Sequence, residues 1–514
     1  MEKIALIYIG GNTTRFALWQ INEDRSYILL QSYKETLKLG QTTRESSRIT
    51  EEKADELMVV LQNFKGVADS LGADTTTLIF SEFFRRISNK VLIQDRIEKE
   101  LSLRTMELSS NEEMELDYLA IVHSMRIRNT LIVDISGGLT QVAWVKEGVL
   151  FKMDSLPLGT LTLTEKFQLE EMVTKDTHVA LENCLNKEIG NIAWLKEGNF
   201  DEMVIVGGSA RAISKIDRNK RRYPMRIIHE YDMQDIDVIN MYNIFMTKSL
   251  RQRYLIEGLD KDRADIILGA LGILSMILKT TKLKNIRVSG AGIREGFLFR
   301  YLTQKQGEMA DMLDRSISNI LSIHTVDKTH AESLYRLTSS IYSAFCTLHK
   351  DWGDLSQIIK VSSKLRDVGL SVRYYNHEKH NFYIISNSEI NGLNHRGIIM
   401  SALASTFTDG LTHEKSIFEY GQIINRMDLS MVNDIGICIS MAEKLLRAEI
   451  KVVTFKRCHI TEDAVQIVFT SKDPMHFEQH EVMKLSDIFL DMYGKTLMVE
   501  IEELKQPESG TASK

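Results

Sequence analysis

The sequence predicts an α/β protein built from two related lobes, followed by a helical region and a small α+β segment. Three observations predict this class. A strand–turn–strand pattern near the N-terminus recurs in a second copy, apolar strands alternate with amphipathic helices, and the pattern turns helical after about residue 300. We therefore expect four domains, at 1–124, 125–300, 301–447 and 448–514.

The repeated pattern covers residues 7–19 and 133–145. Each copy is an apolar strand, a tight glycine-containing turn and a second strand, and charged residues and a third apolar strand follow. This order predicts a three-stranded meander at the start of each lobe, which indicates a duplicated domain rather than a solenoid. The matched pairs are Ile9 with Ile135, Gly11 with Gly137, Thr14 with Thr140 and Ala17 with Ala143.

The remaining elements follow from apolar periodicity. The predicted helices of the two lobes lie at 51–73, 90–101, 111–124, 176–197 and 263–280, and the predicted strands at 77–80, 202–206 and 285–289. Helices fill 307–448. Strands at 450–455, 464–469 and 496–501 end the fold, and 506–514 reads as disordered.

Composition excludes several classes of protein. The chain has 514 residues, of which 43% are hydrophobic, and a net charge of −6, whereas general nucleic-acid binding usually needs a basic domain. It contains no apolar run near the roughly 20 residues that span a bilayer, and no signal peptide is evident. Its four cysteines lack paired or metal-ligand spacing. We expect a cytoplasmic protein with reduced thiols and with neither nucleic-acid nor membrane partners.

Four glycine-containing segments directly follow predicted strands. In such turns, backbone N–H groups lie open and can close on phosphate oxygens. One such turn alone is more often a hairpin, but four favour phosphate binding. The candidate phosphate ligands are Gly10, Gly11, Asn12, Thr13, Ser136, Gly137, Gly138, Gly207, Gly208 and Ser209, and a fourth turn runs from Ser289 to Gly292. The basic run 215–226 reads either as a solvated loop or as a positive rim that attracts a polyanion.

The order of these motifs resembles the Ppx/GppA phosphatase family, within the actin-like ATPase superfamily, over nearly the whole chain. The family's D-x-G-S-N-S-x-R loop is similar to 8–15, its T-x-x-L-R segment to 81–85, its I-S-G-x-E-E-A-R-L segment to 108–116 and its D-I-G-G-G-S-T-E loop to 134–141. Further similar segments are 156–167, 207–211, 288–296 and 383–392. The resemblance implies two actin-like (ribonuclease H-like) domains with a cleft, an all-α HD-like domain and a small α+β C-terminal domain.

The resemblance also implies catalytic roles. Glu113 would orient and deprotonate the attacking water, and Asp134 would support a divalent cation, expected to be Mg²⁺. Arg85, Arg15 and the loop backbones would bind the terminal phosphate. Phosphoryl transfer needs mainly positioning and charge stabilisation, so this small set could suffice. Without the family context, Glu113 would read as a solvated helix carboxylate.

Several positions depart from the family pattern. Tyr8 stands where the family carries Asp, and a phenol is a poor Mg²⁺ ligand. Gln141 replaces the acidic end of the second loop, and Leu139 replaces its Ser. Ser136 replaces a Gly, and Gly290 replaces an Asp. We thus expect the phosphate-binding turns to be intact and the metal site to lack some of the family's carboxylate ligands.

The HD-like region is altered as well. Arg366 stands at the position of the HD histidine, before Asp367. His377 and His380 read as surface histidines or as the lining of a polyanion channel rather than as metal ligands. We therefore expect no working metal-dependent hydrolase in this region.

Two functions follow as hypotheses. The first is an exopolyphosphatase, a phosphoanhydride hydrolase that releases terminal phosphate from inorganic polyphosphate and also acts on guanosine pentaphosphate, with activity reduced by the loss of the first-loop Asp. The alternative is a weakened regulatory protein that binds polyphosphate or guanosine tetra- and pentaphosphate. An actin-like ATPase or kinase fits less well, since no adenosine pocket is evident. The resemblance further implies a homodimer.

Overall fold

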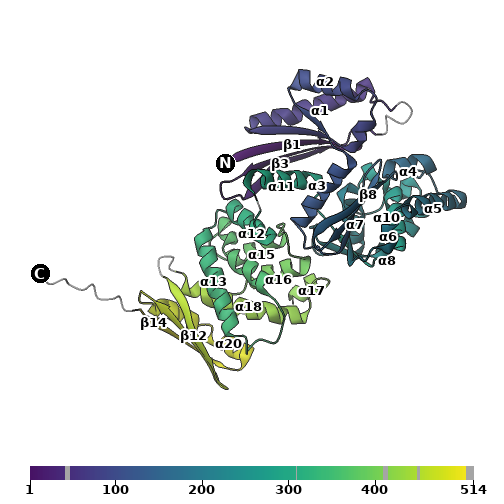
Figure 1. The fold of residues 1–514 in the computed structure, drawn as a ribbon. Coiled ribbons are helices and arrows are strands. Elements are labelled where there is room, and N and C mark those ends of the chain that lie inside the picture. The colour runs from purple at the N-terminus through teal and green to yellow at the C-terminus, as the bar shows by residue number, and fades with distance from the viewer. Residues whose placement is uncertain (41–46, 308, 409–414, 448–451, 505–514) are drawn as a thin grey trace. The chain divides into compact units, whose positions relative to one another are not determined.

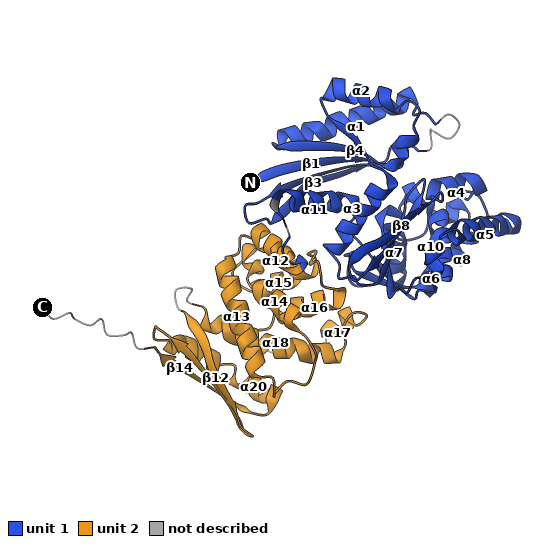
Figure 2. Cartoon of the chain, viewed as in Figure 1, with its two compact units in different colours: residues 1–312 blue, residues 313–514 orange. Residues whose placement is uncertain are grey.

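A computed structural model describes residues 1–40, 47–307, 309–408, 415–447 and 452–504 (Figure 1). The chain divides into two compact units, unit 1 (1–312) and unit 2 (313–514), shown in blue and orange in Figure 2. None of the helices in these described ranges is both long and apolar enough to cross a membrane. Residues 450–451 of a predicted strand and the predicted disordered tail 506–514 lie outside the described residues.

The first lobe of unit 1 is built on a five-stranded sheet in the order β3-β2-β1-β4-β5. Its strands are β1 (Glu2–Ile9), β2 (Thr14–Ile21), β3 (Tyr27–Glu35), β4 (Thr75–Phe80) and β5 (Thr105–Glu107). The first three form an antiparallel meander, and β4 and β5 add in parallel. The helical elements are α1 (Glu51–Ser70), η1 (Glu82–Arg86), α2 (Lys90–Leu101) and α3 (Ser110–Val122).

The second lobe repeats this plan in a six-stranded sheet of order β10-β11-β9-β6-β7-β8. The strands are β6 (Thr130–Ile135), β7 (Thr140–Lys146), β8 (Val149–Leu156), β9 (Glu202–Val206), β10 (Tyr231–Gln234) and β11 (Asn285–Val288). The helical elements are α4 (Thr160–Phe167), α5 (Lys175–Gly190), α6 (Trp194–Glu197), α7 (Gly207–Arg221), α8 (Asp235–Met246), α9 (Leu250–Arg253), η2 (Lys261–Arg263) and α10 (Ile267–Thr281). The last helix before residue 307, α11 (Ile293–Gln306), returns to pack on α3 and the first sheet.

The pairing register confirms the predicted duplication. Tyr8 pairs with Arg15 in the first sheet as Asp134 pairs with Gln141 in the second. The two turns close in the same way: the Gly10 N–H donates to the Thr13 carbonyl, and the Ser136 N–H to the Leu139 carbonyl, both at 3.0 Å. Tyr8 is therefore the counterpart of Asp134.

Hydrophobic burial holds each lobe together. α1 places one apolar face, including Leu57, Leu61 and Phe64, against the first sheet. In the second lobe α10 is buried along nearly its whole length, because it lies among other elements of the lobe. Its continuous apolar sequence is thus a buried core helix rather than a membrane segment.

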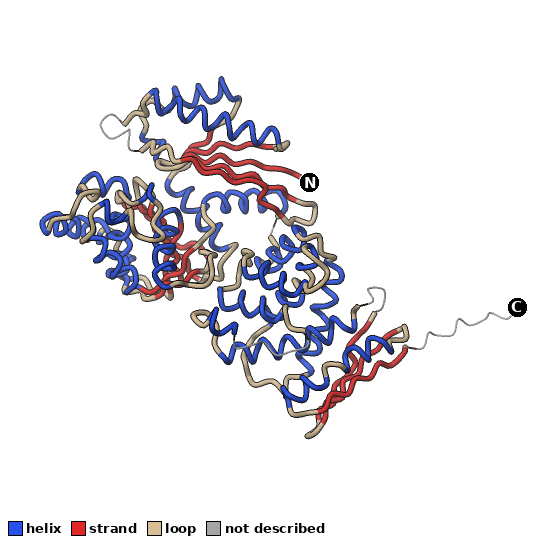
Figure 3. Tube along the Cα trace, turned by 180° about the vertical axis from the view of Figure 1, so that it is seen from behind, coloured by secondary structure: helices blue, strands red, loops and turns tan. Residues whose placement is uncertain are grey.

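Unit 2 combines helices with a three-stranded sheet, and Figure 3 shows the change from helix to strand along the chain. The helical elements are α12 (Met312–Ile323), α13 (Lys328–Ala344), α14 (Ser356–Lys364), η3 (Val368–Ser371), α15 (His377–Ser386), α16 (His395–Ala404), α17 (Lys415–Tyr420), α18 (Arg426–Leu445), α19 (His476–Met483) and α20 (Ser486–Tyr493). The strands are β12 (Val453–Ile460), β13 (Ala464–Ser471) and β14 (Thr496–Glu503). One hydrophobic core includes residues of α13, α18 and all three strands.

Some local predictions were wrong. The segment 207–209 is the first turn of α7 rather than a turn between strands, because Gly207 at a φ of 87° passes directly from β9 into the helix. Of the two interpretations of the basic run 215–226, the solvated loop is wrong for its first part, which lies inside α7 with Ile216 buried. The helix predicted at 176–197 is two helices, α5 and α6.

Candidate active-site cleft in unit 1

A cavity of about 340 Å³ lies between the two sheets of unit 1. It is lined by the β1–β2 turn, the β6–β7 turn and the first residues of α4, α7 and α11. Helix N-termini carry partial positive charge and unpaired N–H groups, so this convergence favours an anion. All lining residues lie between Tyr8 and Glu295, so the cavity belongs entirely to unit 1.

The structure brings nearly all of the predicted site residues to this cavity. Glu113, Asp134 and Arg15 line it, as do the predicted phosphate ligands Gly10, Gly11, Asn12, Thr13, Ser136, Gly137, Gly138, Gly207, Gly208 and Ser209. Arg85 is the exception. Its side chain is exposed and does not line the cavity, because the 3-10 turn of η1 directs Arg86 there instead. None of the residues of the basic run 215–226 is among the lining residues.

The polar side chains of the turns are used differently. The amide of Asn12 is buried, and neither its nitrogen nor its oxygen has a hydrogen-bond partner within the described part of the chain. Ser136 and Ser209 donate to main-chain carbonyls, of Leu139 at 2.9 Å and Ile135 at 2.8 Å. The buried amide of Asn12 therefore has free capacity for a ligand.

Five arginines line the cavity: Arg15, Arg86, Arg211, Arg263 and Arg294. Burial and the guanidinium groups of the last three lower the pKa of Arg15 to about 9, so it remains charged at neutral pH. Burial also lowers the pKa of Arg211 and Arg263. Like charges held together in a buried site are costly, and a polyanion would relieve their repulsion.

Glu113 lies on the first turns of α3, which is fixed by a capping box at Ser109 and Glu112. Its Oε1 accepts hydrogen bonds from the Tyr8 hydroxyl at 3.0 Å and from the Glu82 N–H at 2.9 Å, which leaves Oε2 for another contact. Burial is the main cause that raises the pKa of Glu113 to about 8. A carboxyl poised near neutral pH suits a general base.

Two further carboxylates are buried beside Glu113. Asp117 lies one helical turn further along α3, and its Oδ2 is buried without a hydrogen-bond partner in the described residues. Burial and the charges of Asp134 and Glu113 raise the pKa of Asp117, and burial raises the pKa of Asp134. A cation among these carboxylates would offset their mutual repulsion.

Glycine makes room for these groups at the start of α7. A Cβ at Gly207 would lie 2.1 Å from Asp134 Oδ1, and one at Gly208 would lie 2.2 Å from an Arg263 Nη atom. The helix start can therefore approach both charged groups closely.

Comparisons with known proteins identify the family. The model of the Ppx/GppA phosphatase family matches residues 20–305, and that of Ppx/GppA phosphatase domain III matches residues 313–485. The chain belongs to the Ppx/GppA phosphatase family.

Curated proteins similar to this Ppx/GppA chain are distant in sequence. A guanosine-5'-triphosphate,3'-diphosphate pyrophosphatase of Pseudoalteromonas atlantica is 21% identical, and the match covers 75% of each chain. A bifunctional 3-dehydroquinate synthase/phosphatase of Fusobacterium nucleatum is 22% identical over 53% of this chain and 43% of the relative. Against a pyrophosphatase of Pseudoalteromonas translucida the chain spans 62% of the relative's length.

Solved structures share the fold. An exopolyphosphatase from Cytophaga hutchinsonii is 22% identical with a TM-score of 0.55, covering 59% of this chain and 98% of that one. The Aquifex aeolicus Ppx/GppA family member is 23% identical with a TM-score of 0.53, covering 60% and 99%. These chains are matched almost in full by a part of this chain similar in size to unit 1.

Sequence reasoning missed several charged cavity residues of this Ppx/GppA protein, Arg86 among them. Asp117 could have been found from its spacing, because i and i+4 share a helix face and Glu113 was already a candidate. Arg211 and Arg294 lay inside the quoted motifs 207–211 and 288–296 but were given no role. No sequence motif pointed to Arg263, because it reaches the cavity only through the position of η2 in the fold.

Proposed function

We propose that this protein is a phosphoanhydride hydrolase that releases the terminal phosphate of inorganic polyphosphate, with guanosine pentaphosphate as a second substrate. The observation that carries the proposal is one cavity containing both a cationic cradle and a buried carboxyl of raised pKa. A polyphosphate end is an extended polyanion, and five arginines and three helix N-termini complement it.

Glu113 would act as the general base. Both of its hydrogen bonds go to Oε1, so Oε2 can accept a proton from water while the carboxylate stays in place. The Tyr8 hydroxyl remains protonated, because burial raises its pKa well above the ordinary value. Tyr8 thus acts as a donor that stabilises the ionised form of Glu113.

Magnesium is expected from the family, and the buried carboxylates fit it. Carboxylate oxygens are preferred ligands of hard cations, and Asp134 and Asp117 present them on two elements that meet in the cavity. We propose that Asp134 and Asp117 hold the ion, with Asp117 supplying the carboxylate that Tyr8 lacks. When bound, the ion would neutralise charge that develops on the phosphate oxygens.

The arginines would bind the substrate. Arg15 has no hydrogen-bond partner for its side chain in the described residues, and Arg211 makes only a long bond of 3.4 Å to the Gly290 carbonyl. Their donors are therefore available for phosphate oxygens. Arg85 has no support for such a role, since it lies outside the lining.

The deciding experiment compares the parent with Glu113→Gln on long-chain polyphosphate and Mg²⁺, with released orthophosphate as the readout. We expect release by the parent and a loss of at least about 100-fold in the variant, because the base is removed while the arginines still bind. Polyphosphate binding measured by calorimetry should stay within about threefold of the parent.

A second candidate is a binding protein derived from the enzyme fold. The observation that favours it is Tyr8, which occupies the place of a family carboxylate and contacts the proposed base. Binding of polyphosphate without release by the parent would establish this function. If the parent shows no release and no binding, both functions are refuted.

A further inference from the structure

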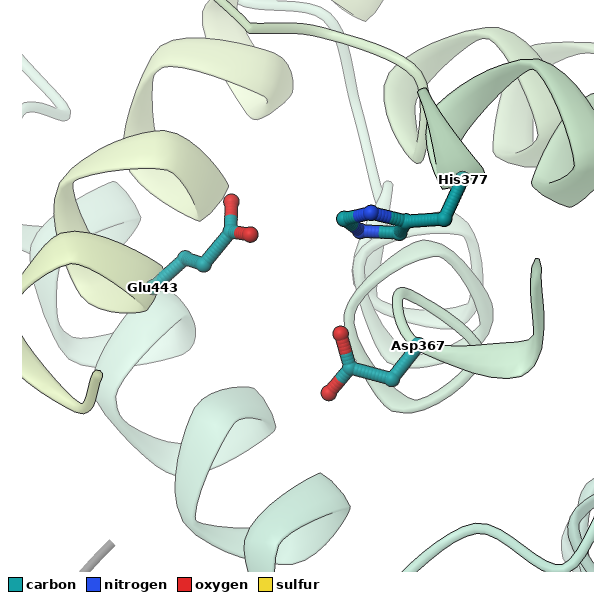
Figure 4. A group of neighbouring side chains, drawn as sticks. All are labelled: Asp367, His377 and Glu443. Carbon is teal, nitrogen blue, oxygen red and sulfur yellow. The ribbon is translucent and has the colours of Figure 1, made fainter. Parts of the chain in front are cut away.

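Unit 2 contains a cluster of three potential metal ligands, on elements that contribute nothing to the cavity in unit 1. Asp367 lies between α14 and η3, His377 is the first residue of α15, and Glu443 lies on α18. One ligand atom of each lies within 4.8 Å of the other two. Figure 4 shows the three side chains directed toward a common space.

The imidazole of His377 is oriented as a metal ligand. Its Nδ1 lies 3.1 Å from the Tyr374 carbonyl oxygen, and a carbonyl can only accept, so Nδ1 carries the proton. Nε2 then holds a free lone pair, and it is buried with no hydrogen-bond partner in the described parts of unit 2. A ring fixed by Nδ1–H to a carbonyl is the usual outer contact of a ligating histidine.

The carboxylates are held in place and each keeps an oxygen to offer. Both bonds from Arg366, at 3.1 and 2.8 Å, go to Oε2 of Glu443, which leaves Oε1. Oδ2 of Asp367 lies 3.3 Å from Nε2 of His330, which leaves Oδ1. When the His330 imidazole is neutral, the two carboxylates exceed the single guanidinium of Arg366 by one negative charge, which a cation would offset.

The spacing does not suit a direct ion pair. The nearest carboxylate contact of the His377 ring is Nδ1 with Oε1 of Glu378, at 3.9 Å, and neither Asp367 nor Glu443 is paired with Nε2. The cluster is thus too wide for hydrogen bonds between its members. An ion with bonds of about 2.0–2.2 Å to nitrogen and oxygen would bridge it after small side-chain shifts.

We propose that Asp367, His377 and Glu443 bind one divalent transition-metal ion, with Zn²⁺ as the preferred species. One imidazole with two carboxylates suits zinc better than Mg²⁺, which rarely takes nitrogen ligands. The ion would tie the η3–α15 segment to α18 and act structurally. The expectation that His377 is a surface histidine is corrected, since its side chain is 14% exposed.

The test uses full-length, tag-free protein stripped with chelator, in an Asp134→Asn, Asp117→Asn background that removes both carboxylates proposed for the cleft ion. Zn²⁺ is titrated by calorimetry, and bound metal is counted by mass spectrometry of the dialysed protein. We expect about one Zn²⁺ per chain, with binding at least about tenfold weaker after adding His377→Asn.

His380→Asn is the matched control, because His380 lies on the same helix outside the cluster. It should bind like the background, and Zn²⁺ should raise the Tm of the control but not of H377N. Asp367→Asn serves as a second test should H377N fail to fold. Equal Zn²⁺ affinity in H377N and the background, or no bound Zn²⁺ in the background, would overturn the proposal.

Discussion

Tyr8 donates a hydrogen bond to Glu113 Oε1 at 3.0 Å, and this contact lowers the pKa of a carboxyl that burial has raised. The tyrosine that replaces the family's Asp therefore affects the pKa of the proposed base, Glu113. The same residue pairs in the sheet as Asp134 does in the second lobe, so one half of the duplication keeps an acid and the other keeps a phenol.

Tyr8→Phe should move the acidic limb of the pH–rate profile to higher pH by about one unit. A hydrogen bond to a charged group contributes about 1.5–3 kcal/mol, and one pKa unit corresponds to about 1.4 kcal/mol. The measurement is kcat/KM for orthophosphate release between pH 6 and 10, and the parent should rise with pH up to about 8, the pKa of Glu113.

Tyr118→Phe is the control for this profile. Tyr118 also lies on α3, but its hydroxyl donates to the Gly148 carbonyl at 2.9 Å, away from Glu113. An identical profile for Y8F and the parent would mean that Tyr8 does not tune the base.

Glu113→Gln should raise the stability of the metal-free protein at alkaline pH. The carboxyl has a folded pKa of about 8 against an ordinary value of 4.5, so the folded state binds the proton more tightly. The free energy of unfolding therefore falls as the pH rises from about 4.5 to about 8. The neutral amide of the variant does not titrate and removes that loss. We expect a net gain of about 2 kcal/mol at pH 9, after the cost of one unpaired amide N–H, and none at pH 4, by urea unfolding with chelator present.

At the scale of elements, α3 and α7 determine the site. α3 carries Glu113 and Asp117, and the side chain of Gln141 on β7 donates from Nε2 to the Ser110 carbonyl at its start. Gln141 is buried and does not line the cavity. Its replacement of the family's acid is thus explained by a structural contact with the helix that carries the base.

Restoring the acid by Gln141→Glu should lower stability rather than raise activity. The new carboxylate would face a carbonyl oxygen with no donor between them, at a cost of about 2 kcal/mol. Thermal unfolding and orthophosphate release together test this. A variant that is more active and as stable as the parent would contradict it.

Gly207→Ala should reduce turnover at least about 100-fold and destabilise the protein by about 1–3 kcal/mol. The φ of 87° is strained for alanine, and the new Cβ would lie 2.1 Å from Asp134 Oδ1. Gly72→Ala is the matched control, because its φ of 69° carries similar strain with nothing within 4 Å. It should cost about 1 kcal/mol and leave turnover unchanged.

At the scale of the whole molecule, unit 1 contains every residue that lines the cavity. Two solved relatives are matched over 98–99% of their lengths by about 60% of this chain. Chains of about this size therefore adopt the fold. The predicted four-domain division stays a prediction, as does the homodimer.

A chain ending at Met312 should therefore fold and keep orthophosphate release within about tenfold of the full chain, since the residues proposed for chemistry are all present. Circular dichroism checks the fold, and the release assay checks the activity. A folded but inactive fragment would show that unit 2 contributes to the reaction.

The sequence by itself determined the elements and their duplication, because both depend on local periodicity and on glycine at turns. The repeat at 7–19 and 133–145 reappears as matching register, and Glu113, Asp134 and the phosphate turns meet in one cavity as expected. These residues lie at strand ends or on the first turn of a helix, where sequence order fixes their position.

Only the tertiary structure decided which charged groups share the cavity. Arg263 reaches it through η2, Arg85 turns away to solvent, and Asp117 joins it because α3 is buried on that face. In unit 2, His377 and Glu443 lie far apart in sequence but within one cluster. Long-range packing sets such distances, and a pattern with a period of two or 3.6 residues carries no information about them.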